Sequence, residues 1–75
     1  MSAKAAAKEL LAGALLIDAS AVPHDARLGR IEQWDSLAHA RLLLALEEKL
    51  RRQLTTDEAV GVESLDDIAR LIEQR

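Results

Sequence analysis

Apolar residues recur at helical spacing in three stretches of the chain, and each stretch follows a residue that can cap a helix. The first stretch is predicted to form a helix that Ser2 caps and that runs to about Ile17. One stripe of this helix carries three apolar residues, Leu10, Ala14 and Ile17. The second stretch lies in IEQWDSLAHARLLLALEEKL, residues 31–50, and predicts a helix from Ser36 to about Arg52 with Asp35 as its N-cap.

The C-terminal part of the chain contains two further helix starts. Thr55 and Glu58 have the spacing of a capping box, which predicts a short third helix that ends near Gly61. Ser64 and Asp67 repeat the device at the start of the last helix. That helix carries apolar residues at i, i+3, i+4 and i+7, namely Leu65, Ile68, Ala69 and Ile72.

Residues 18–34 show no sustained period and contain the only proline, so we expect a long loop between the first two helices. Val22, Leu28 and Ile31 are the residues expected to hold this loop to the core. The predicted fold class is therefore all-α: a four-helix bundle of three main helices and one short one.

Composition supports a single helical domain spanning residues 1–75. Ala and Leu dominate the apolar residues and there is no Phe or Tyr, which disfavours strands. Without cysteine the protein itself supplies no disulfide and no thiol. The net charge of −3 weighs against nucleic acid as a partner.

The N-terminal stretch predicts a helix of the domain rather than a signal peptide, because Lys8 and Glu9 interrupt its apolar run. No run reaches the length of a membrane span. We therefore expect a cytoplasmic protein, without membrane insertion and monomeric.

The second helix is expected to have two unlike faces. Leucines line the side expected to face the core, with His39 among them: Leu43, Leu46, Leu50 and Leu54. The opposite side carries Leu37, Arg41, Leu44, Ala45, Glu48 and Arg52. Because Leu37 and Leu44 lie about two turns apart on this polar side, they favour a docking stripe for a partner.

Ser36 lies at the N-terminus of this predicted helix, beside backbone N–H groups that have no partner within the helix. No nucleophile elbow surrounds it and no histidine has an evident orienting partner, so a hydrolase nucleophile is not indicated. A phosphate ester on Ser36 would be stabilised by the helix dipole by roughly 0.3–1 kcal/mol. An attachment point for a phosphodiester is the role that remains.

The tripeptide DSL opening a Leu-rich helix, with ALEE two turns later, resembles the acyl carrier proteins. The resemblance covers nearly the whole chain, including the order of helices and the long loop. It implies that residues 1–75 form a phosphopantetheine carrier domain, which is a substrate of other enzymes and not itself a catalyst. It also implies that a phosphopantetheinyl transferase moves 4′-phosphopantetheine from coenzyme A onto Ser36.

In that family the thiol of the arm carries acyl groups as thioesters between an acyl-loading ligase or transferase and downstream acyl-using enzymes. Such a thiol is imported, which would fit a chain without cysteine. Carried over by position, Asp35 would help to place metal and coenzyme during transfer, and Leu37 would dock into partners. Leu44, Ala45 and Glu48 would complete the recognition face.

The sequence also departs from the family pattern. Ala38 and Arg41 fill positions that are often acidic in carriers of fatty acid synthesis, and WDSL with a histidine two residues later resembles stand-alone carriers of specialised pathways. Arg41 is expected in the middle of the docking stripe. Peptidyl carriers usually have glycines where Gln33 and Trp34 stand, so an aminoacyl cargo ranks second.

Other interpretations remain open. An unmodified helical interaction module would use Leu37 and Leu44 only for binding, and a small DNA-binding domain would use Arg41, Arg51 and Arg52. His24 and His39 match no metal-ligand motif. We expect His39 at the edge of the core with its nitrogens hydrogen-bonded, and Trp34 packed on the loop rather than part of a docking surface.

Overall fold

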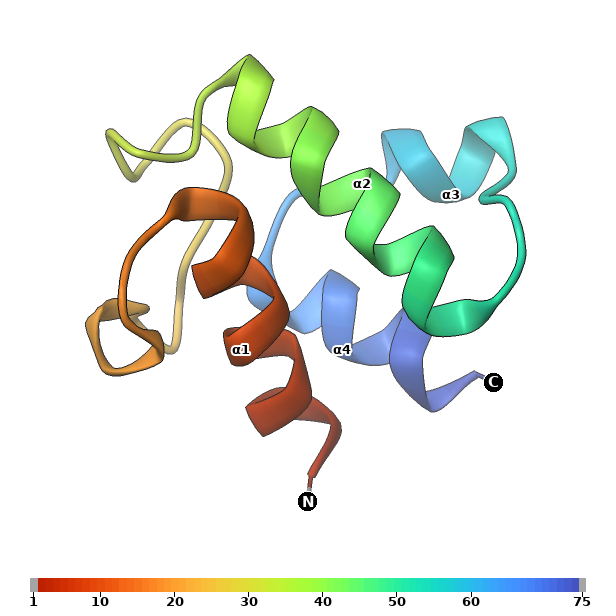
Figure 1. The fold of residues 1–75 in the computed structure, drawn as a ribbon, viewed down its shortest axis with the longest axis horizontal. Helices are drawn as coiled ribbons and strands as arrows, with labels where there is room; N and C mark the ends of the chain where they lie inside the picture. Colours follow the sequence, from red (N-terminus) through yellow and green to blue (C-terminus); the bar gives the residue numbers. More distant parts are fainter. Residues whose placement is uncertain (1, 75) are drawn as a thin grey trace.

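Four α-helices and one short 3-10 helix make up the regular structure of the computed structural model, which describes residues 2–74 (Figure 1). The α-helices are α1 (Ala3–Leu15), α2 (Ser36–Leu50), α3 (Thr56–Val60) and α4 (Leu65–Glu73), and the 3-10 helix is η1 (Ala19–Ala21). Within the described range there is no strand beyond an isolated bridge, so the all-α prediction is confirmed.

All four helix starts lie where local side-chain chemistry predicts them. Ser2, Asp35, Thr55 and Ser64 are the N-caps, and each accepts a hydrogen bond from the backbone N–H three residues later. The capping box of α3 is complete, because the backbone N–H of Thr55 also donates to Glu58 Oε1 at 2.9 Å. Each cap satisfies a donor that the helix leaves unpaired.

Two helix ends were predicted wrongly. α1 ends at Leu15 rather than near Ile17, and α2 ends at Leu50 rather than near Arg52. The reason is that Leu16 (φ 61°) and Arg51 (φ 59°) adopt the left-handed conformation and terminate their helices. Helices often end in this way, but the residue is usually glycine, and neither position offers that signal.

α1 is the central helix, since it packs against both α4 and α2 (Figure 1). The core between them consists mainly of alanine and leucine side chains, together with isoleucines of α4. Its largest fully buried side chains are Trp34, Leu11, Leu42, Leu46, Leu65, Ile68 and Val62. Trp34, which comes from the loop and not from a helix, is the largest of them.

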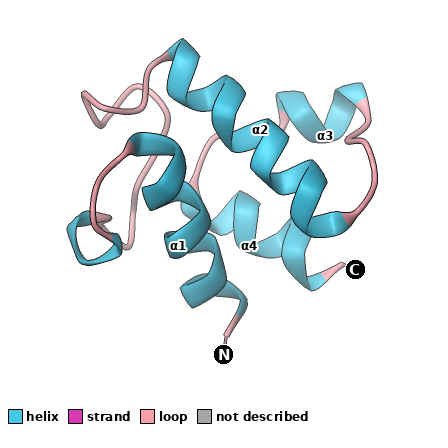
Figure 2. Ribbon diagram, viewed as in Figure 1, coloured by secondary structure: helices cyan, strands magenta, loops and turns pink. Residues whose placement is uncertain are grey.

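The long connection between α1 and α2 is drawn as loop except for η1 (Figure 2). Main-chain hydrogen bonds hold it to the segment before α4: the N–H of Leu28 donates to Glu63 O at 2.8 Å, and the N–H of Leu65 donates to Ala26 O at 3.1 Å. Val22 is buried as predicted, but Leu28 is 40% exposed. The prediction for Leu28 is wrong because the main chain holds this segment, and the smaller Ala26 fills the core instead.

Candidate functional site at the start of helix α2

Ser36 is the first residue of α2, and its side chain is exposed. The carboxylate of Asp35 accepts a hydrogen bond from the N–H of Ala38 at 2.8 Å, and the Asp35 carbonyl accepts from the N–H of His39 at 2.9 Å. The N–H groups of Ser36 and Leu37 have no acceptor within residues 2–74. The hydroxyl of Ser36 therefore stands beside two open donors at the positive end of a helix.

Trp34 lies directly before this cap and is only 2% exposed. Its indole Nε1–H donates to His39 Nδ1 at 3.1 Å, and the two ring centroids are 6.1 Å apart. A buried indole N–H needs an acceptor, and this histidine provides it. The prediction that Trp34 packs inside the loop, rather than forming part of a docking surface, is confirmed.

His39 is half-buried at the edge of the core, as predicted, but only one of its two nitrogens, Nδ1, is hydrogen-bonded within residues 2–74, whereas both were expected to be. Because Nδ1 accepts the indole proton, the neutral ring carries its own proton on Nε2. Partial burial lowers the pKa of His39 below 6.5, since desolvation disfavours the charged imidazolium. The hydrogen bond and the burial therefore favour the same neutral form.

The core face of α2 differs from the predicted one. Ala38, Leu42 and Leu46 are fully buried, whereas Leu43, Leu50 and Leu54 are half-buried. Leu46 was predicted correctly, but the buried line passes through Leu42 rather than Leu43. One residue corresponds to about 100° of helix rotation, so the sequence pattern placed the centre of this face too far round the helix.

Leu37 and Leu44 are exposed as predicted, with 65% and 66% of their surfaces accessible. Glu48 is also exposed, whereas Ala45 is half-buried. These positions place two large apolar side chains, separated by two turns, on the outer surface of the helix that Ser36 begins.

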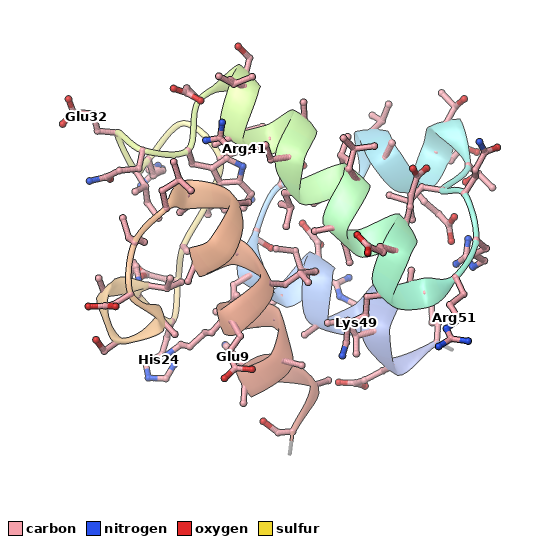
Figure 3. All side chains as sticks on the ribbon, viewed as in Figure 1. Glu9, His24, Glu32, Arg41, Lys49 and Arg51 are labelled. Atoms are coloured by element: carbon pink, nitrogen blue, oxygen red, sulfur yellow. The ribbon has the colours of Figure 1, made fainter. Side chains whose placement is uncertain are left out.

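Arg41 does not lie in the middle of an exposed stripe, which corrects the predicted placement. It is half-buried, and its Nε donates to the carbonyl of Ala14 at 2.9 Å, where the end of α1 approaches α2 (Figure 3). The last turn of α1 contains no basic residue of its own. Arg41 supplies a donor to that turn from another helix, a contact across 27 residues that no local pattern announces.

Arg52 is also engaged, in a bidentate pair with Glu58 at 2.8 and 2.9 Å. This pair and the N–H of Thr55 lower the pKa of Glu58 from 4.5 to about 2. Of the three arginines on which a DNA-binding surface would depend, Arg41 and Arg52 are therefore held by protein groups. The geometry gives no support to that alternative.

Two hollows in the described surface do not include Ser36 in their lining. One of about 270 Å³ is bordered by α3 and α4 and lined by residues such as Asp57, Val62 and Arg70. Another of about 230 Å³ lies in the long loop, next to Pro23 and Arg30. His24 is exposed and lies far along that loop from α2 (Figure 3). Ser36 is thus an exposed residue at a helix start and lines neither hollow, which suits attachment to its hydroxyl better than catalysis in a pocket.

Within residues 2–74 no group of three or more potential ligands is arranged to hold a metal ion, and no helix is long and apolar enough to cross a bilayer. Comparisons with models of known protein families, with curated proteins and with solved structures find no match. The function must therefore be argued from the residues around Ser36.

Proposed function

We propose that this protein is a phosphopantetheine carrier, with Ser36 as the attachment residue. The observation that carries the proposal is the exposed serine of a DSL sequence at the first position of α2, preceded by its capping aspartate. The neighbouring amides of Ser36 and Leu37 are free to bind a phosphate oxygen. Ser36 thus combines an accessible hydroxyl with neighbouring backbone N–H groups that can bind a phosphate.

The attachment reaction would take place on a phosphopantetheinyl transferase. Ser36 Oγ would form a bond to the phosphorus of coenzyme A that bears the pantetheine, and the bond between that same phosphorus and the bridging oxygen would break. Adenosine 3′,5′-bisphosphate would leave, and the hydroxyl proton would pass to a base or to water. The resulting phosphodiester carries one negative charge, which the start of a helix favours.

The arm would then carry acyl groups as thioesters from a loading ligase or transferase to downstream enzymes. Leu37 and Leu44 would supply the apolar contacts for these partners, with Glu48 beside them. Asp35 would help to place metal and coenzyme during the transfer reaction. Ala45 and Arg41 would contribute less to the docking surface because both are half-buried. An acyl cargo of a specialised pathway remains our first proposal and an aminoacyl cargo the second, both on the resemblance of the WDSL segment.

The test is the intact mass of the protein after incubation with coenzyme A and a broad-specificity transferase. Wild type should gain one phosphopantetheine, and Ser36→Ala should gain none while keeping the helical circular dichroism spectrum. Ser20→Ala, which removes another exposed serine, is the matched control and should load like wild type. Loading of the Ser36→Ala variant, or no loading of wild type, would end the proposal.

An unmodified interaction module is a second candidate, because Leu37 and Leu44 are exposed whether or not Ser36 is modified. It predicts partner binding that depends on both leucines and is the same for wild type and Ser36→Ala. A carrier should instead need Ser36 for every downstream reaction. Measuring how Leu37→Ala, Leu44→Ala and Ser36→Ala each bind a partner isolated from the host, and whether each supports its reaction, separates the candidates.

A further inference from the structure

The histidine beside Ser36 has a free proton donor whose position the fold controls. His39 lies three residues after Ser36, so their Cβ atoms are about 5–6 Å apart on neighbouring turns. Side chains on a helix lean toward its N-terminus, and the bond to Trp34 shows that the His39 ring reaches back across the first turn. The ring therefore lies over the part of α2 that contains Ser36.

The other ring nitrogen of His39 is open to solvent. Nδ1 is occupied by the indole N–H of Trp34, and Nε2 has no partner within residues 2–74. In the same range no polar side-chain atom is both sealed from solvent and unpaired. Since Nδ1 accepts, Nε2 carries the proton and presents it outward.

We propose that His39 Nε2–H donates a hydrogen bond to the phosphodiester on Ser36, and that Trp34 orients the ring and fixes the tautomer that makes this possible. The inference rests on the proposed function, because the phosphodiester is its ligand. His39 is a positioning residue here: it holds the base of the arm and takes no part in forming the thioester. Trp34 in turn resembles the partner groups that fix the tautomer of a functional histidine elsewhere.

The surrounding charges leave His39 available for this role. The carboxylate of Asp35, one turn before it, already accepts the N–H of Ala38. Arg41 is directed to the end of α1. Desolvation, and not a charged neighbour, is what lowers the pKa of His39.

The first experiment concerns the unmodified protein. Imidazole ¹⁵N shifts should show the Nε2–H tautomer of His39 as the dominant form in wild type and a mixture in Trp34→Phe, which keeps a large apolar ring but lacks the donor. His24, exposed and in the long loop, should be the same in both proteins. A wild-type mixture, or no change in a Trp34→Phe variant shown to be folded by circular dichroism, would overturn the role of Trp34.

The second experiment uses the protein after loading with coenzyme A and transferase. Loading should raise the pKa of His39 by about 0.7, the size expected in water for one negative charge about 4 Å away, which is the distance that a direct hydrogen bond sets, and leave that of His24 unchanged. The ³¹P signal of the arm should follow the His39 titration in wild type and become flat in His39→Gln, with His24→Gln as control. An unchanged His39 pKa, or the same ³¹P response in His39→Gln, would overturn the hydrogen bond.

The two proposals fail in different ways. If Ser36 does not load, the mass measurement refutes the carrier function and with it the ligand assigned to His39. If Ser36 loads but the ³¹P signal ignores His39, only the role of His39 is wrong.

Discussion

Leu42, Leu43 and Leu44 are consecutive residues of α2 in three different environments. Leu42 is fully buried, Leu43 is half-buried and Leu44 is 66% exposed. Substituting each by alanine in turn removes the same atoms from the same helix. The three variants therefore measure burial with chemistry and helix propensity held constant.

The structure sets the expected order of the losses. At Leu42 the truncation should lower the free energy of unfolding by about 2–5 kcal/mol, because a cavity is added to the lost transfer energy. At Leu44 about a third of the side chain is covered, so the loss should stay below about 1 kcal/mol, and the better helix propensity of alanine offsets about 0.2 kcal/mol of it. Leu43→Ala should fall between the two.

These differences are large for a domain of 75 residues, whose total stability is about 4–11 kcal/mol. One kcal/mol corresponds to about 4–8 °C in a domain of this size, so Leu42→Ala should lower Tm by roughly 10 °C or more. Urea and thermal unfolding followed by circular dichroism measure both quantities. If Leu43→Ala proves the most damaging, the core face lies where the sequence pattern put it, and the assigned faces of α2 are wrong.

Three further predictions follow from particular contacts. Leu16→Gly and Arg51→Gly should each stabilise the protein by about 0.5–1 kcal/mol in urea unfolding, because both residues hold left-handed conformations at helix ends; a loss of stability at both would contradict the assigned caps. The pKa of Glu58 is lowered to about 2, so as the pH falls the unfolded chain takes up this proton before the folded protein does. The stability that Glu58 contributes is therefore full above pH 4.5 and disappears as the pH falls toward 2. Glu58→Gln should make the free energy of unfolding depend less on pH across that window, as measured by urea unfolding at a series of pH values. Protonation of His39 removes the acceptor of the indole N–H, so Trp34 fluorescence should change as the pH falls below 6.5 in wild type and His24→Gln but not in His39→Gln.

The starts of the helices could be read from the sequence because capping is a local interaction. Each cap involves residues three apart, so Ser2, Asp35, Thr55 and Ser64 carry their own signal. The ends of α1 and α2 could not be read in the same way. Leucine and arginine are common inside helices, so neither residue type signals a helix end. Only the surrounding structure holds Leu16 and Arg51 in the left-handed region.

The orientation of α2 was harder to predict for a related reason. The segment LLLAL places leucines on several sides of the helix, so spacing alone allows more than one core face. Packing against α1 settles the choice in favour of Ala38, Leu42 and Leu46. Arg41 illustrates the same limit, because its acceptor on Ala14 lies 27 residues earlier in the chain.

The position of Trp34 connects the stability of the fold to the geometry of the candidate site. An indole buried to this extent helps to anchor the end of a long loop, but its N–H must find an acceptor or lose about 1–3 kcal/mol. The acceptor is His39, three residues after Ser36 on the same helix, so the same bond that satisfies the core also fixes the orientation of a ring one turn from the serine. Replacing His39 by an apolar residue would therefore disturb both at once, whereas His39→Gln keeps a group able to accept the indole proton. This is why the glutamine variant, and not an alanine variant, is the appropriate probe of the site.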